Sequence, residues 1–339
     1  MSFWSRRIFA RSAAGLLLLA GFPVAFGAEP AMGATGSTVT ICAVPKSAPH
    51  TEKTVQVAKR AVGKLLARSL SYPGPCAQYG QSAPLGNGRL TAFSQTRGKI
   101  PLVIGLLAKD GTYDGLPYEP PTSGIWCYDK NGDGTVDQHR ECTGGHERSL
   151  RLSPKFTKRV DSPFTYVLAN WNPMGHMPPH IWDVPHFDVH FYMNPEAERL
   201  AIRPGPCPQL TNCDDYPKGK ILPAAKYRHP DYEDTDAVEP GMGNHLVDTT
   251  APEFHGGKFT SSFIYGIWNG KVTFYEPMVN LAQYNGLRNG TIDDRCVPIK
   301  LPQAYERSGW YPTRYCMRHR YNRAETVTSL EGFVYRTAG

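Results

Sequence analysis

Short β-like runs separated by turn residues dominate this 339-residue sequence and leave few fold classes open. The clearest pair is residues 259–268 and 271–276, joined by Asn269-Gly270, because Asn-Gly accepts the positive φ angles of a two-residue hairpin turn. Thirty-three Gly and 30 Pro punctuate the other runs. We therefore predict a mainly β fold, either an antiparallel barrel or a two-sheet sandwich, with an N-terminal helix. The other predicted strands are 88–93, 101–107, 164–168, 187–192 and 327–335.

The N-terminal helix is predicted over residues 51–70. Thr51 can cap it, and apolar residues from Val55 to Leu70 recur at helical spacing. This helix belongs to an N-terminal extension, residues 28–80. A barrel-like β domain is expected over 81–339, with an insertion at 127–142.

The first 27 residues have the pattern of an export signal. Ser5-Arg6-Arg7-x-Phe9 resembles a twin-arginine signal, and an apolar run from Ala13 to Phe26 follows it. This run is too short to span a membrane, so we expect cleavage before Ala28 and no stable membrane insertion afterwards. Cleavage removes three arginines and lowers the formal net charge from +7 to +4, which argues against a nucleic-acid partner. The mature chain is then periplasmic or secreted.

Eight cysteines fit that location. An even number in an exported chain is typical of a disulfide framework, and no Cys-x-x-Cys pair suggests a metal site. Eight cysteines allow 105 connectivities, among which pairing of neighbours along the chain is the simplest. Those pairs are Cys42–Cys76, Cys127–Cys142, Cys207–Cys213 and Cys296–Cys316.

Residues 129–137 resemble the first part of an EF-type calcium loop. Their side-chain oxygens alternate along the chain, and Gly134 permits the sharp turn. Arg140 stands where the loop usually has its bidentate Glu, and Glu141 comes one residue late, so we expect weak, structural calcium binding. The alternative is an acidic hairpin tip without an ion. The predicted calcium ligands are Asp129, Asn131, Asp133, Thr135 and Asp137.

Histidines cluster on one predicted strand. Alternation along residues 185–192 places His186, Asp188 and His190 on one face, and Phe187, Val189 and Phe191 on the other. The apolar face must enter the core, so the polar face points to solvent or into a barrel lumen. The two imidazoles lie about 13 Å apart on a regular strand, too far to share one metal unless the strand is bulged.

Other segments offer further ligands. We expect a mononuclear site for Zn, Mn, Fe or Cu with His186, His190 and His245 as imidazole ligands and Asp188 as their partner. His176 or Glu276 would be a further ligand or the catalytic proton carrier. The alternative is a polar sheet face whose histidines form hydrogen bonds with their neighbours.

At these residues the sequence resembles an uncharacterised family of exported bacterial proteins, a domain of unknown function. The likeness is carried by Asn172-Pro173-x-Gly175-His176-x-Pro178, by Pro185-His186-Phe187-Asp188-x-His190-Phe191-Tyr192 and by shorter motifs within residues 81–336. It implies a β-rich, oligomeric fold with a link to envelope stress, and no established reaction. His180 and Leu246 depart from the family pattern, and the calcium-like loop is an insertion relative to it.

Together these features predict an exported metal-binding protein, acting as a metalloenzyme on a small molecule. The metal would activate water or dioxygen by Lewis-acid or redox chemistry. The alternatives are a non-catalytic periplasmic protein that binds a metal or ligand, or one that serves in envelope stress, and a purely structural envelope protein.

Overall fold

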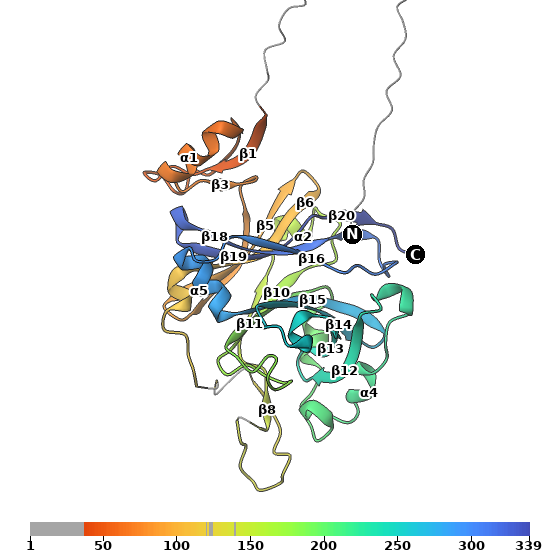
Figure 1. The fold of residues 1–339 in the computed structure, drawn as a ribbon. Coiled ribbons are helices and arrows are strands. Elements are labelled where there is room, and N and C mark those ends of the chain that lie inside the picture. Colours follow the sequence, from red (N-terminus) through yellow and green to blue (C-terminus); the bar gives the residue numbers. More distant parts are fainter. Residues whose placement is uncertain (1–36, 120, 122–124, 139) are drawn as a thin grey trace, which may run out of the picture. The chain divides into compact units, whose positions relative to one another are not determined.

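Two large antiparallel sheets carry most of the fold (Figure 1). The computed structural model describes residues 37–119, 121, 125–138 and 140–339. One sheet has the strand order β12-β13-β14-β15-β11-β10-β9, and the other has the order β16-β18-β19-β6-β5-β4. The strands of the first sheet are β9 (His146–Arg151), β10 (Tyr166–Asn172), β11 (His186–Tyr192), β12 (Tyr232–Glu239), β13 (Gly243–Asp248), β14 (Ser261–Trp268) and β15 (Lys271–Asn280). Those of the second are β4 (Gln78–Leu85), β5 (Gly88–Arg97), β6 (Ile100–Lys109), β16 (Arg295–Pro298), β18 (Arg314–Arg320) and β19 (Glu325–Glu331).

The two sheets face each other across one apolar core. Phe187, Val189 and Phe191 of β11 pack in the same cluster as Leu90 of β5 and Leu106 of β6. Among the described residues both sheets are open and end in edge strands, so they form a sandwich and not a closed barrel. The mainly β prediction is confirmed, with the sandwich as the arrangement observed.

The predicted Asn-Gly hairpin is confirmed. It joins β14 to β15 through Asn269 and Gly270, whose φ angles are 49° and 76°. These angles are those of a turn that matches the right-handed twist of the two strands.

The N-terminal extension contains a shorter helix than predicted. Residues 53–58 form β2 (Lys53–Ala58), which pairs with β1 (Thr38–Ala43), and the helix α1 covers only Val62–Arg68. The prediction of a helix over 51–70 is therefore wrong for its first part. Val55 and Val57 alternate with polar residues and are β-branched, so this segment pairs with β1 although its apolar residues also fit a helical spacing.

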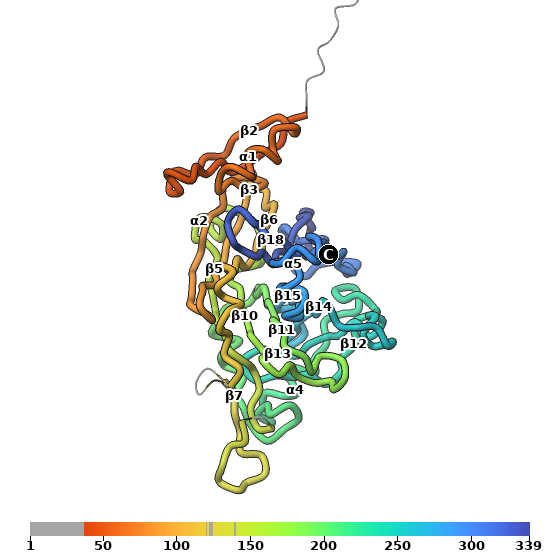
Figure 2. The backbone as a smooth tube through the Cα atoms, turned by 60° about the vertical axis from the view of Figure 1, so that its left-hand side comes forward, coloured from red at the N-terminus to blue at the C-terminus, as the bar shows by residue number. Residues whose placement is uncertain are grey.

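Smaller elements connect the sheets. Within the described residues, short α-helices and 3₁₀ turns lie in the loops, and the hairpin that contains the calcium-like loop extends away from the sheets at the foot of Figure 2. The remaining strands are β3 (Tyr72–Pro73), β7 (Trp126–Cys127), β8 (Cys142–Thr143), β17 (Gly309–Tyr311) and β20 (Val334–Arg336). The remaining α-helices of the described residues are α2 (Pro154–Thr157), α3 (Glu196–Leu200), α4 (Tyr216–Gly219) and α5 (Leu281–Asn289).

All four neighbour pairings of the cysteines are confirmed. Disulfides join Cys42–Cys76, Cys127–Cys142, Cys207–Cys213 and Cys296–Cys316. They are consistent with an oxidising environment outside the cytoplasm. The predicted export signal lies outside the described residues, and within them no helix combines the length and apolar character needed to cross a membrane.

Candidate metal centre

Strand β11 has two chemically different faces, as its alternation predicts. Phe187, Val189 and Phe191 enter the core between the sheets, whereas His186, Asp188 and His190 point to the opposite face of the seven-stranded sheet. The polar face is buried as well, with both histidines at 0% exposure and Asp188 at 4%. It therefore faces neither solvent nor a barrel lumen, which were the two predicted alternatives.

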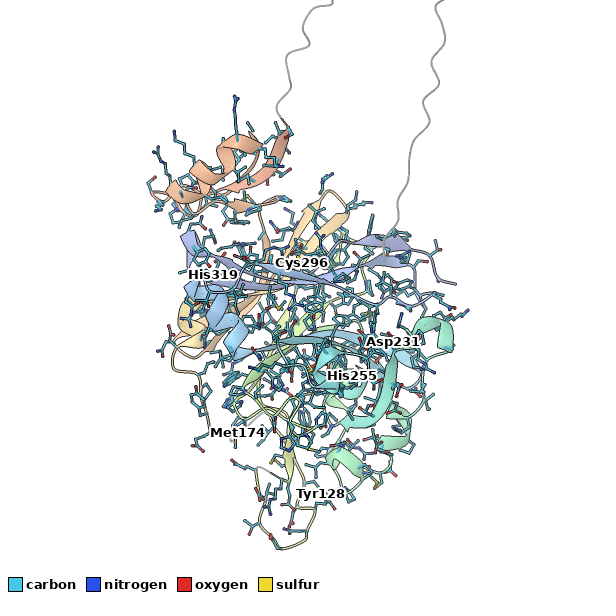
Figure 3. All side chains as sticks on the ribbon, viewed as in Figure 1. Tyr128, Met174, Asp231, His255, Cys296 and His319 are labelled. Carbon is cyan, nitrogen blue, oxygen red and sulfur yellow. A yellow bond between two sulfur atoms is a disulfide. The ribbon has the colours of Figure 1, made fainter. Side chains whose placement is uncertain are left out.

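A cavity of about 760 Å³ lies over this polar face. His176, Asp188, His245 and Glu276 line its wall. Met174 and several residues of the 127–142 hairpin also line it. Figure 3 labels Met174 and, on the hairpin, Tyr128. The buried ligand candidates are thus reached from a space large enough for a small molecule.

The deepest group consists of His190, His245 and Glu276, whose ligand atoms all lie within 4.8 Å of one another. His190 Nε2 is 3.5 Å from Glu276 Oε1, and His245 Nε2 is 3.7 Å from Glu276 Oε2. These gaps are too long for hydrogen bonds. They are close to the separation of about 3.4 Å between ligand atoms of a tetrahedral metal bound at about 2.1 Å.

Both imidazoles of this group are oriented by the backbone. His190 Nδ1 lies 3.4 Å from the carbonyl of Leu168, and His245 Nδ1 lies 3.0 Å from that of Ala237. If Nδ1–H donates to these carbonyls, each ring turns an Nε2 lone pair toward Glu276. Metal-binding histidines are usually held in this way.

Gly266 makes room for this approach. His245 of β13 pairs with Gly266 of β14. Strand β14 lies between β13 and β15, the strand of Glu276. The ring of Phe274 lies over the glycine so closely that a Cβ there would be 2.0 Å from it. Phe274 packs edge-on against both His190 and His245 and holds the two rings in place.

No Lys or Arg among the described residues forms an ion pair with Glu276. His190 Nε2 and Glu276 Oε2 are buried and have no hydrogen-bond partner among the described residues. Burial lowers the pKa of His190 to about 3 and that of His245 to about 4. Burial, with a smaller contribution from the charge of Asp188, raises the pKa of Glu276 well above its usual range. The side chains alone therefore provide two neutral imidazoles and a carboxyl group that is costly to ionise.

A second group contains His176, His186 and Asp188. His186 Nε2 is 3.1 Å from Asp188 Oδ1, and His176 Nε2 is 3.4 Å from Asp188 Oδ2. Burial acts to raise the pKa of Asp188, but the two imidazoles outweigh it and hold that pKa well below its usual range. Burial likewise acts to lower the pKa of His176, and Asp188 outweighs it and raises that pKa.

The loop before β11 brings His176 to Asp188. Its backbone N–H donates to the carbonyl of Trp182, and Gly175 has a φ of 72°. A Cβ on Gly175 would lie 2.2 Å from the Trp182 carbonyl oxygen, so only glycine permits this tight closure. Gly175 therefore closes the loop that carries His176 to Asp188, which explains why the two residues are adjacent in the Asn-Pro-x-Gly-His segment.

The structure separates residues that the sequence placed in one site. The expected mononuclear set of His186, His190 and His245 is divided between the two groups, because β10 and β11 pair in continuous register without a bulge. Glu276, expected as a ligand or proton carrier, lies between two Nε2 atoms, which is the position of a ligand. Asp188 contacts His176 and His186, and no contact joins its carboxylate to His190 or His245 among the described residues.

Two site residues were missed by the sequence reasoning. Asn172 donates a 2.6 Å hydrogen bond to Asp188 Oδ2, and Glu239 lines the cavity and accepts a hydrogen bond from Thr143. Asn172 belongs to the Asn-Pro-x-Gly-His segment and pairs with His186 across the sheet, so pairing that segment with β11 could have found it. Glu239 carries no comparable signal.

The calcium-like loop presents its oxygens to its own backbone. Asp129 accepts from the N–H groups of Gly132 and Gly134, and Glu141 accepts from those of Lys130 and Asn131. The close ligand groups found among the described residues do not include its carboxylates. Calcium binding at this loop stays a prediction.

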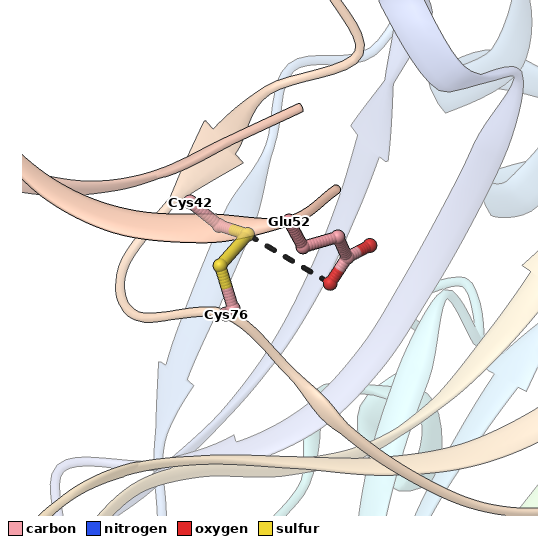
Figure 4. Close-up of side chains that lie close together, drawn as sticks. All are labelled: Cys42, Glu52 and Cys76. Atoms are coloured by element: carbon pink, nitrogen blue, oxygen red, sulfur yellow. Dashed lines mark hydrogen bonds between the residues drawn. A yellow bond between two sulfur atoms is a disulfide. The ribbon is translucent and has the colours of Figure 1, made fainter. Parts of the chain in front are cut away.

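Two further groups combine a disulfide with a glutamate. Figure 4 shows Glu52 beside the Cys42–Cys76 disulfide, and Glu331 lies near Cys296–Cys316. A sulfur in a disulfide is not a thiolate, so neither group offers the ligands of a Cys metal site.

In a comparison with known proteins, no family model, no curated protein and no solved structure matches the chain.

Proposed function

We propose that this protein binds a divalent transition metal through His190, His245 and Glu276 and uses it as a Lewis acid on a small molecule. The observation that carries the proposal is a buried carboxyl group between two inward-facing Nε2 atoms, with no cation from the described residues beside it. Two imidazoles and one carboxylate are a set that binds zinc or iron in enzymes.

The cavity supports a catalytic role. His245 and Glu276 line it, whereas His190 is fully buried behind them. Three protein ligands leave at least one coordination position open, and a water there becomes a nucleophile near neutral pH. A storage site would instead surround its ion with protein atoms.

The compartment is part of the proposal. Four disulfides support an exported protein, in agreement with the N-terminal signal pattern. Assembly into a homo-oligomer, implied by the family resemblance, stays a prediction.

Metal content tests the proposal directly. The full chain, purified without a His tag and reloaded with Zn²⁺ after chelation, should lose bound zinc on Glu276→Gln and on His245→Ala. Glu253→Gln is the matched control, because Glu253 is a buried glutamate with an unpartnered oxygen outside both histidine groups. Equal zinc in Glu276→Gln and Glu253→Gln would refute the site.

An exchangeable water separates an enzyme from a storage protein. Protein loaded with Mn²⁺ should enhance the relaxation of water protons, since an open position exchanges water with the bulk. Bound Mn²⁺ without that enhancement would show a closed site and favour the non-catalytic alternative.

A further inference from the structure

The second histidine group repeats the chemistry of the first. In both groups one carboxylate stands between two imidazoles, and all four rings place Nδ1 near a backbone carbonyl. His186 Nδ1 is 2.7 Å from the Val184 carbonyl, and His176 Nδ1 is 2.8 Å from that of Met177. With Nδ1–H donating, each Nε2 keeps a lone pair and lies within 3.7 Å of a carboxylate oxygen, and His186 Nε2 also accepts a 3.4 Å hydrogen bond from Asn172 Nδ2.

One carboxylate oxygen of this second group lacks a hydrogen-bond partner among the described residues. Asp188 Oδ1 finds no hydrogen-bond partner in the described part of the chain, although His186 Nε2 is only 3.1 Å away. A metal bound between His186 Nε2 and Asp188 Oδ1 would give this oxygen a partner and would replace the long 3.4 Å contact of Nε2 with Asn172 Nδ2.

From this repetition we infer that His176, His186 and Asp188 bind a second divalent transition metal, so that the cavity holds two ions. The inference rests on the proposed function, because it adds an ion to the same cavity. Of the two roles that the sequence suggested for His176, a further ligand or a proton carrier, it assigns the ligand.

The geometry of β11 sets the spacing of the two sites. Asp188 and His190 are alternate residues on one strand face, so their anchoring points lie roughly 7 Å apart. Asp188 and His176 line the cavity, as do His245 and Glu276 of the first group. Each ion would therefore face the same cavity.

Metal stoichiometry tests the inference and separates it from the proposed function. After chelation and reloading with Zn²⁺, the full chain should bind two ions, Asp188→Asn one, Glu276→Gln one, and the double variant none. His176→Ala serves as a second probe of the same site, because its side chain is 39% exposed and on a loop, where a substitution should not prevent folding. Zinc is measured per chain by elemental analysis after gel filtration.

Each outcome has one meaning. One ion in the wild type, unchanged in Asp188→Asn and His176→Ala but lost in Glu276→Gln, would overturn the second site and leave the proposed function standing. Two ions that survive in Glu276→Gln would instead refute the proposed function. As an independent measurement, electron paramagnetic resonance of the chain loaded with two Mn²⁺ should show spectral broadening from coupled ions, and an uncoupled spectrum would contradict their shared cavity.

Discussion

Two buried glutamates in this protein have opposite surroundings. Glu325, on β19, is 0% exposed and contacts three cations: Arg323 at 2.7 Å, Lys109 at 2.8 Å and Arg320 at 3.1 Å. Glu276, on β15, is 1% exposed and contacts two imidazoles at 3.5 and 3.7 Å. Burial acts to raise the pKa of both, but at Glu325 the three cations outweigh it and lower the pKa.

The difference separates a structural carboxylate from the one that we propose as a metal ligand. A buried charge must be neutralised, and at Glu325 the chain does this itself. At Glu276 no cation among the described side chains does so, and both flanking nitrogens are presented as acceptors. The missing cation makes Glu276 costly to ionise in the metal-free protein. The same gap between the two imidazoles is the place where we propose that a metal binds.

Substituting each glutamate by glutamine should give the largest contrast. Glu325→Gln leaves three cations without their carboxylate, and we expect it to lower the free energy of unfolding by about 3–5 kcal/mol. Metal-free Glu276→Gln should be as stable as the wild type or more stable, because the amide can donate to a neighbouring Nε2. Urea unfolding of both variants measures this, and equal losses would end the distinction.

Added metal should affect the two variants in the opposite order. At a free Zn²⁺ concentration of 100 times Kd, each ion that binds the native state stabilises the wild type by about 2.7 kcal/mol. Glu325→Gln should gain the same increment and Glu276→Gln a clearly smaller one. Thermal unfolding with Zn²⁺ and with chelator gives these increments, and a full gain in Glu276→Gln would place the ion elsewhere.

Acid should remove part of the contribution of Glu325. Its pKa in the folded state is below the ordinary value of 4.5, so the stability linked to its charge is complete above that pH. This stability is lost as the pH falls through the folded pKa. The gap between wild type and Glu325→Gln should therefore shrink from pH 7 to pH 3 in urea unfolding, and a constant gap would mean that the charge of Glu325 contributes nothing.

Much of this site could be predicted from the local sequence. The alternation of residues 186–192 correctly assigned each side chain to a face, and the strand rise correctly warned that His186 and His190 cannot share an ion on a regular strand. The Asn-Gly turn placed Glu276 on a hairpin strand. These inferences succeeded because each depends on the geometry of one segment.

The grouping of the ligands could not be predicted in this way. His245 reaches Glu276 across β14, and His176 reaches Asp188 from a loop, so both contacts depend on the strand order and on loop closure. The helix predicted for 51–70 failed for a related reason: the pairing of residues 53–58 with β1 is a contact that local spacing does not contain. Partners distant in sequence are set by the assembled sheet.

Asp188 is the intermediate case between the two glutamates, and its neutral partner offers the finest test. Asn172 donates to Asp188 Oδ2 and so fixes the carboxylate that we assign to the second ion. Asn172→Ala should weaken that ion about tenfold, or about 1.4 kcal/mol, because oriented ligands bind metals more tightly. The ion at Glu276 should keep its affinity, since Asn172 contacts no member of that group among the described residues.

Competition with a chromogenic zinc chelator resolves the two dissociation constants, with Asn170→Ala as the control from the same strand and cavity. Equal weakening by both substitutions would show that the cavity responds to any lost amide, and Asn172 would then have no orienting role of its own.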